Sequence, residues 1–164
     1  MTLLIALSIS IGLLAVVATW LFLGPVALAA TFTMQIWIVF VAWAGYYHNG
    51  GKTKGATTTI VCMSLGAVLG MASVMLAGQL GALGGFAVPV AVGIGAALCV
   101  LAAHMALFAS IPSTVYGFAS IAGLILLGKD MSPEKAILPA ILSVIVGAAF
   151  AWLSEFIGSK MTKA

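Results

Sequence analysis

Long apolar runs, each near the length that crosses a lipid bilayer, dominate this chain. About six runs are separated by short connections rich in glycine, proline or charge, and ~20 helical residues cross ~30 Å of hydrocarbon. Only 5% of the 164 residues are Asp, Glu, Lys or Arg, whereas a soluble domain carries roughly 25% to keep its surface wetted. We therefore expect one all-α integral membrane domain, residues 1–164, with six transmembrane helices. The expected spans are residues 2–23, 26–47, 56–77, 86–103, 106–127 and 136–157.

The lysines predict the orientation in the membrane. Six spans place four lysines on the side of the termini and two on the other, and positive connections favour the cytoplasm. Both termini are therefore expected in the cytoplasm. The net charge of +3 comes without a basic stripe carrying interleaved aromatics, so the expected partner is the lipid bilayer and not nucleic acid. The two sets are Lys52, Lys54, Lys160 and Lys163 against Lys129 and Lys135.

The two halves of the chain, about residues 1–78 and 79–164, resemble each other. A shift of 77 residues places Gly70 on Gly147 and Gly66 on Ser143, so one small-xxx-small packing pattern falls on another. Three spans per half is an odd number, so a second copy enters the membrane upside down, as in the inverted repeats of many transporters. The pattern predicts a 3+3 inverted repeat; because glycine and alanine are abundant, a chance match is the alternative.

Neutral polar and aromatic side chains concentrate in the second and fifth expected spans. A Gln amide in hydrocarbon is costly unless its hydrogen bonds are made, so Gln35 must face another helix, water or a solute. One interpretation is a solute path between these spans, with Gln35 and Thr114 as hydrogen-bonding groups and Trp37 and Tyr116 as its walls. The other is that these groups only tie helices together. The candidate pore residues are Thr33, Gln35, Trp37, Ser110, Ser113, Thr114 and Tyr116.

Ionisable groups are missing from the middle of every expected span. Ion-coupled carriers usually need one there, so a pump for charged substrates is disfavoured. His48 and His104 lie at expected span ends, where they could gate a path or sense pH, or simply be hydrated at the interface. Cys62 and Cys99 have no metal-ligand spacing. No nucleophile and base pair suggests an enzyme, and we expect neither a metal nor a cofactor.

Two short tracts carry a family resemblance. Residues 46–55 read Tyr-Tyr-His-Asn-Gly-Gly-Lys-Thr-Lys-Gly and residues 110–117 read Ser-Ile-Pro-Ser-Thr-Val-Tyr-Gly. They resemble the small bacterial inner-membrane family catalogued as domain of unknown function 1097. This chain differs by His48-Asn49 where the family has Pro-Gln, and by Ser113 between Pro112 and Thr114. The resemblance covers nearly the whole chain and implies a bacterial inner membrane, without an established activity.

These observations favour a channel or facilitator for a small uncharged polar solute such as urea or a short amide. The first alternative is a secondary transporter or exporter of a small organic solute, coupled through His48 or His104. The second is a membrane scaffold or accessory subunit whose glycine faces serve assembly. Six short spans make a thin bundle, so a homo-oligomer is expected in each case.

Overall fold

The fold is all-helical. The computed structural model describes residues 2–128 and 131–163, and within them no strand occurs. The α-helices are α1 (Leu3–Leu23), α2 (Leu28–Phe32), α3 (Ile36–His48), α4 (Lys52–Gln79), α5 (Ala87–Leu101), α6 (Ile111–Leu127) and α7 (Pro133–Lys163). Short 3-10 helices η1 (Gly81–Phe86), η2 (Ala102–His104) and η3 (Ala106–Phe108) lie between α4 and α6.

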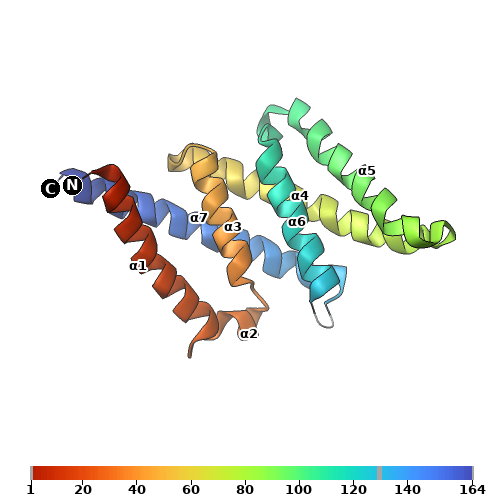
Figure 1. Ribbon diagram of the computed structural model, residues 1–164, viewed down its shortest axis with the longest axis horizontal. Helices are drawn as coiled ribbons and strands as arrows, with labels where there is room; N and C mark the ends of the chain where they lie inside the picture. The colour runs from red at the N-terminus through yellow and green to blue at the C-terminus, as the bar shows by residue number, and fades with distance from the viewer. Residues whose placement is uncertain (1, 129–130, 164) are drawn as a thin grey trace.

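Two long helices form the centre of the molecule, and the others pack across them (Figure 1). α4 and α7 contact each other and run in opposite directions, and the short helices α3 and α6 cross them. α6 packs mainly along α4, whereas α3 packs mainly along α7. α1 lies against α7 at one end, and α5 lies against α4 at the other. Each long helix thus holds a short helix and an outer helix.

Four helices of the described chain are long and apolar enough to cross a membrane, where the sequence predicted six spans. They are Leu3–Leu23, Lys52–Gln79, Gly81–His104 and Pro133–Thr162, which correspond to the first, third, fourth and sixth expected spans. α3 has 13 residues and α6 has 17. At about 1.5 Å per residue, these are roughly 20 and 26 Å long and fall short of ~30 Å.

The second expected span, residues 26–47, is wrong as one helix, because the chain breaks between α2 and α3. Thr33 has φ 54°, in the left-handed region. The backbone N–H of Gln35 donates to Ser143 Oγ (2.9 Å), and Gln35 Nε2 donates to the Thr33 carbonyl (3.0 Å). These bonds replace those that would continue the helix, so α3 starts only at Ile36.

The fifth expected span, residues 106–127, is also shorter than predicted. α6 begins at Ile111, after η2 and η3. Pro112 stands in its first turn, where a missing backbone N–H does no harm and the fixed φ suits a helix start. The α-helix is therefore confined to residues 111–127, about the last three quarters of the expected span.

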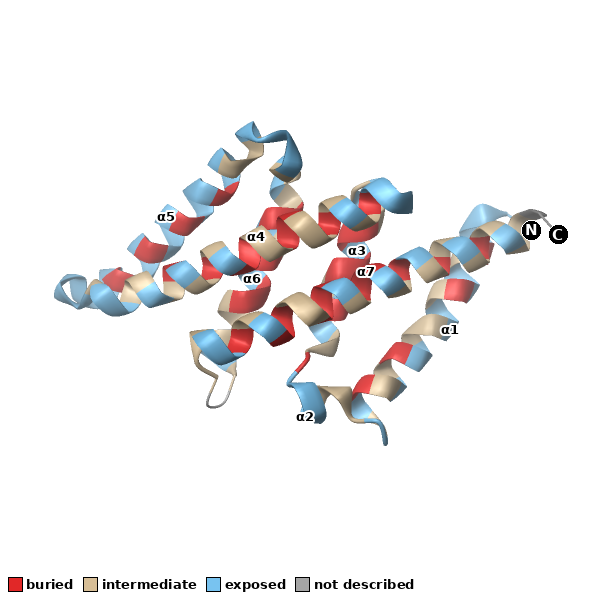
Figure 2. Cartoon of the chain, turned by 180° about the vertical axis from the view of Figure 1, so that it is seen from behind, coloured by how far each residue is buried: buried red, intermediate tan, exposed pale blue. Residues whose placement is uncertain are grey.

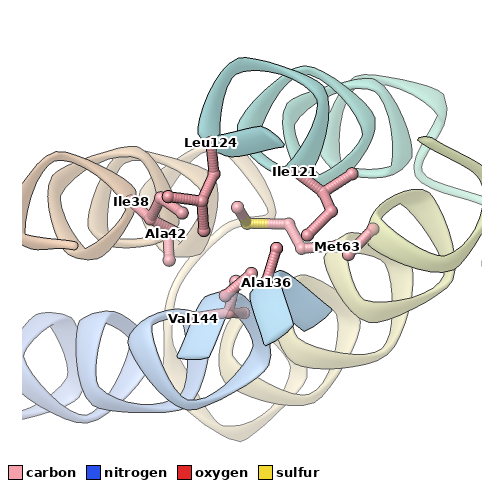
Figure 3. Packing of buried hydrophobic residues seen from close by; sticks show 9 residues of the cluster. Ile38, Ala42, Met63, Ile121, Leu124, Ala136 and Val144 are labelled. Carbon is pink, nitrogen blue, oxygen red and sulfur yellow. The ribbon is translucent and has the colours of Figure 1, made fainter. Parts of the chain in front are cut away.

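The core lies where four helices meet. Ile38 and Ala42 of α3, Met63 of α4, and Ile121 and Leu124 of α6 are buried together (Figure 3). α7 completes this cluster with three small or branched side chains, Ala136, Ala140 and Val144.

Buried residues form narrow stripes along the helices, and much of α1 and α5 is exposed (Figure 2). α1 exposes Leu4, Leu13 and Val16, and α5 exposes Val92 and Ile94 among other large apolar side chains. Exposed apolar helices of this length need an apolar environment. Together with the four long apolar helices, they indicate a membrane protein whose outer faces contact lipid.

Glycines let α4 and α6 approach to backbone contact. A Cβ atom added at Gly66 would lie 1.8 Å from the Thr114 carbonyl oxygen, and one added at Gly117 would lie 1.9 Å from the Met63 carbonyl oxygen. Neither neighbour is the end of a flexible side chain, so a larger residue would force the helices apart. Small residues are used in this way where helices pack in lipid.

We expect Gly66→Ala to destabilise the protein strongly. Overpacking of a tight contact costs about 1–3 kcal/mol, and here the obstacle is backbone. The control is Gly12→Ala in α1, where an added Cβ meets nothing within 4 Å. Thermal unfolding in detergent should give a lower melting temperature for Gly66→Ala alone. Equal melting temperatures for both variants would contradict the close α4–α6 contact.

Candidate functional site

A neutral polar network lies where α3 ends, around Asn49. Its amide nitrogen is within hydrogen-bonding distance of the Gly45 carbonyl (2.9 Å), Thr59 Oγ1 (2.9 Å) and Ser113 Oγ (2.8 Å). Its amide oxygen accepts a hydrogen bond from Ser110 Oγ (2.7 Å). One side chain thereby joins the end of α3, the first half of α4 and the start of α6.

The network continues along the first turn of α6. Ser110 Oγ lies 3.0 Å from Ser113 Oγ, and Thr114 Oγ1 donates to the Ser110 carbonyl (3.2 Å). Thr59, Ser113 and Thr114 are fully buried, so these bonds satisfy hydroxyls that would otherwise be costly. Every member of the network is uncharged. We call Asn49, Thr59, Ser110, Ser113 and Thr114 the Asn49 network.

A hollow opens beside the network and reaches the outside of the bundle. It has a volume of about 700 Å³ and is lined almost equally by polar and apolar atoms. Asn49 and Ser110 connect it to the network. We call it the Asn49 hollow; its lining residues are His48, Asn49, Gly50, Lys54, Thr58, Ala106, Ala109, Ser110 and Pro112.

The two histidines differ in their surroundings. His48 lines the Asn49 hollow and meets Tyr116 edge to face, with ring centroids 6.0 Å apart and Tyr116 Oη 3.5 Å from Nδ1. His104 lies on the exposed surface, where its Nδ1 is 3.0 Å from the Leu101 carbonyl of its own turn. Of the two predicted gating residues, only His48 adjoins a hollow and a predicted pore residue.

A second hollow, of about 370 Å³, lies at the other end of the α3–α6 pair. Gln35 lines it from the residue before α3, Trp37 from α3 and Gly123 from α6. The Trp37 ring comes within 3.6 Å of the position that a Cβ of Gly123 would take. We call this the Trp37 hollow; it is completed by Ala119, Leu124, Leu127 and Gly128.

The predicted pore residues therefore form two groups. Ser110, Ser113, Thr114 and Tyr116 are at the Asn49 end, whereas Gln35 and Trp37 are at the opposite end. Gln35 and Thr114 lie at opposite ends of the pair, because α3 and α6 are antiparallel and Gln35 precedes the first turn of α3. Thr33 also lies at that end, in a third hollow of about 510 Å³ with Glu134 and Lys135.

Two adjacent residues of α7 hold the end of α3. Glu155 Oε2 accepts hydrogen bonds from Tyr46 Oη and from the backbone N–H of Lys52 (2.7 Å). Ser154 Oγ lies 2.7 Å from Tyr47 Oη and accepts from Trp43 Nε1 (3.1 Å). The carboxylate also favours the start of α4, since a helix N-terminus attracts negative charge.

Sequence reasoning missed Asn49 and the inward role of Glu155. The local signal for Asn49 was its place before Gly50-Gly51, because Asn and Gly commonly end helices. Gly51 has φ 69°, and a Cβ there would lie 2.9 Å from Glu155 Oε2. That contact depends on the tertiary fold, so no local sequence pattern predicts it.

Metal ligands do not cluster in the described part of the chain: no three His, Cys, Asp or Glu side chains come close enough to hold an ion. Cys62 and Cys99 are free and buried. The chemistry that the arrangement offers is hydrogen bonding by neutral groups.

Asn49→Ala should destabilise the α3–α4 turn against α6. The substitution leaves Thr59 and Ser113 without their amide partner, and each unsatisfied buried polar group costs about 1–3 kcal/mol. The control is Thr57→Val, because the Thr57 hydroxyl bonds only carbonyls of its own helix. A fall in melting temperature for Asn49→Ala alone is expected; an unchanged value would argue against the network.

Glu155→Ala should loosen the start of α4. Tyr46 Oη and the Lys52 amide lose their common acceptor, so we expect faster hydrogen exchange at the Lys52 amide and a lower melting temperature. Glu134→Ala is the matched control, since Glu134 is exposed. Unchanged exchange at Lys52 in Glu155→Ala would contradict the observed cap.

Comparison with known proteins identifies the family. No curated protein and no solved structure matches the chain. The family described as Protein of unknown function (DUF1097) matches residues 8–159, which confirms the resemblance seen in the two short tracts. With a match over nearly its whole length, the chain belongs to the DUF1097 family.

Proposed function

We propose that this protein is a membrane facilitator for a small uncharged polar solute, such as urea or a short amide. The observation that carries the proposal is the neutral Asn49 network beside an open hollow, with a second hollow at the far end of the same helix pair. We call the contact between α3 and α6, from Asn49 and Ser113 to Trp37 and Gly123, the α3–α6 seam. The solute would cross along this seam.

The chemistry of the seam suits uncharged solutes. Hydroxyl, amide and carbonyl groups can replace the hydrogen bonds that a neutral solute makes to water, which lowers the cost of entering an apolar interior. Lys54 lies only at the rim of the Asn49 hollow, exposed to solvent. An ion would find no opposite charge among the described residues of the seam itself.

The seam is closed at its centre, so passage requires a gating motion. Ile38 and Ala42 of α3 pack with Ile121 and Leu124 of α6 in one buried cluster, and Leu124 borders the Trp37 hollow. α3 and α6 contact each other less than they contact α7 and α4, respectively. A small displacement of one short helix with its long helix would open the seam, as in gated transport proteins.

The proposed 3+3 inverted repeat fits this mechanism. Its halves would be α1, α3 and α4 (with α2) and α5, α6 and α7, within residues 1–78 and 79–164. Gly66 and Gly70 of α4 contact α6, while Ser143 and Gly147 of α7 contact α3. Equivalent positions of the two long helices therefore each bind the short helix of the other half, as two related halves would. Discontinuous helices at the interface of two repeats often line transport paths.

Orientation and assembly are part of the same proposal. The bonds from Asn49 to Ser110 and from Lys52 to Glu155 bring the α3–α4 turn, the start of α6 and the end of α7 to one end of the molecule. Lys52, Lys54 and Lys160 belong to that end, so we place it and both termini in the cytoplasm, with the chain in a bacterial inner membrane. The exposed apolar faces of α1 and α5 leave room for a homo-oligomer.

A second candidate is a proton-coupled transporter of a small organic solute. His48 favours it, because this ionisable ring lines the Asn49 hollow and contacts Tyr116. Flux that rises with a pH gradient, and loses this dependence in His48→Gln, would select the coupled transporter over the passive facilitator.

Proteoliposomes carrying the wild type should pass urea or acetamide faster than empty vesicles in stopped-flow light scattering. Gly123→Phe should abolish the excess flux, because the new ring fills the Trp37 hollow. Gly93→Phe in α5 is the matched control: the same change is made where nothing lies within 4 Å of an added Cβ, and flux should be unchanged. All three proteins must elute as folded, monodisperse species.

Two results would contradict the proposal. One is the absence of excess flux for every neutral solute tested with folded wild-type protein, which would favour a scaffold or accessory subunit. The other is equal flux through Gly123→Phe and Gly93→Phe, which would exclude the seam as the route.

A further inference from the structure

Ser120 in α6 is an exception among the buried polar side chains. It is 2% exposed, and its hydroxyl is the sole buried side-chain polar atom of residues 2–128 and 131–163 without a hydrogen-bond partner. Other buried serines bond to carbonyls: Ser73 to Leu69, and Ser143 to Pro139. Because buried polar groups are nearly always paired, an unpaired one calls for an explanation.

Ser120 lies on α6 between Ser113 and Gly123, the two α6 residues that mark the ends of the α3–α6 seam. One turn before it, Tyr116 contacts His48 at the end of α3; one turn after it, Gly123 faces Trp37 at the start of α3. Ser113 of the Asn49 network lies seven residues earlier, which is two helical turns and therefore nearly the same face. Ser120 therefore lies on the seam beyond the Asn49 network, next to Ala119, which lines the Trp37 hollow.

Its neighbours along the helix belong to the apolar core. Ile121 and Leu124 pack with Ile38 and Met63 in the core (Figure 3). For packing alone an alanine at position 120 would suffice, because its side chain has no polar atom that needs a hydrogen-bond partner. In the closed seam the hydroxyl has no partner, and a polar molecule that enters the seam would supply one.

We propose that the Ser120 hydroxyl is a hydrogen-bonding site for a small neutral molecule in transit through the open seam. This inference rests on the proposed function and extends it to a specific residue. The hydroxyl can both donate and accept, so it suits molecules that carry both kinds of group. Water and short amides share that chemistry.

Cysteine labelling tests whether the site becomes accessible. Ser120→Cys would be made in a chain with Cys62→Ala and Cys99→Ala, reconstituted in vesicles and treated with methyl methanethiosulfonate. Ser73→Cys in the same chain is the control, because Ser73 is equally buried but its hydroxyl is bonded within α4. We expect modification at least tenfold faster for Ser120→Cys, slowed by acetamide. Equal rates for the two variants would overturn the proposal.

Flux through Ser120→Ala tests the hydrogen bond. Losing one hydrogen bond to a passing solute should lower permeability about fivefold, with the melting temperature unchanged or raised because an unpaired hydroxyl is removed. Reduced acetamide flux identifies an amide as the ligand, and reduced osmotic water flux identifies water. Wild-type fluxes of both would overturn the proposal.

The failure of this inference differs from the failure of the proposed function. Wild-type flux with slow labelling of Ser120→Cys would leave a facilitator whose path avoids Ser120. Fast labelling that acetamide slows, without flux through the wild type, would leave a binding site in a protein that does not transport.

Discussion

Backbone contact between α4 and α6 is the constraint on which the rest of the structure depends. Gly66 and Gly117 lie against carbonyl oxygens of the opposite helix, so even a methyl group at either position would separate the two axes. This approach brings the start of α6 beside Thr59 of α4, close enough for Asn49 to bond both helices. The polar network therefore depends on the glycines that let these two helices cross at backbone contact.

The other long helix holds its short helix by a different means. A Cβ added at Gly147 would lie 2.4 Å from the Val39 carbonyl oxygen of α3, and hydrogen bonds add to this close contact. Ser143 bonds the Gln35 backbone at one end of α3, while Glu155 bonds Tyr46 at the other. α3 is thus held to α7 by hydrogen bonds at both of its ends, and such bonds can be exchanged for bonds to water or solute at a low cost.

The sequence predicted the class, the four long apolar helices and the family, because these depend on composition and on long apolar runs. It did not predict the break before α3, since the bond from Gln35 to Ser143 joins residues that are 108 positions apart and apolarity continues across the break. Pro112 was a local signal for the start of α6 that the apolar run concealed. For the same reason the sequence did not show that Gln35 and Thr114 lie at opposite ends of the α3–α6 pair.

A gated path needs a closed state that is stable but not by a wide margin, because a small molecule can shift an equilibrium only by its differential affinity. The closed α3–α6 seam has features that stabilise it and features that weaken it. Its apolar plug of Ile38, Ala42, Ile121 and Leu124 favours closure, whereas the unpaired Ser120 hydroxyl and the sparse direct contact of α3 with α6 weaken it. An alanine at position 120 would strengthen the closed state and remove a stopping point for the solute. The hydroxyl therefore makes physical sense in a seam that opens and is an unexplained cost in one that stays closed.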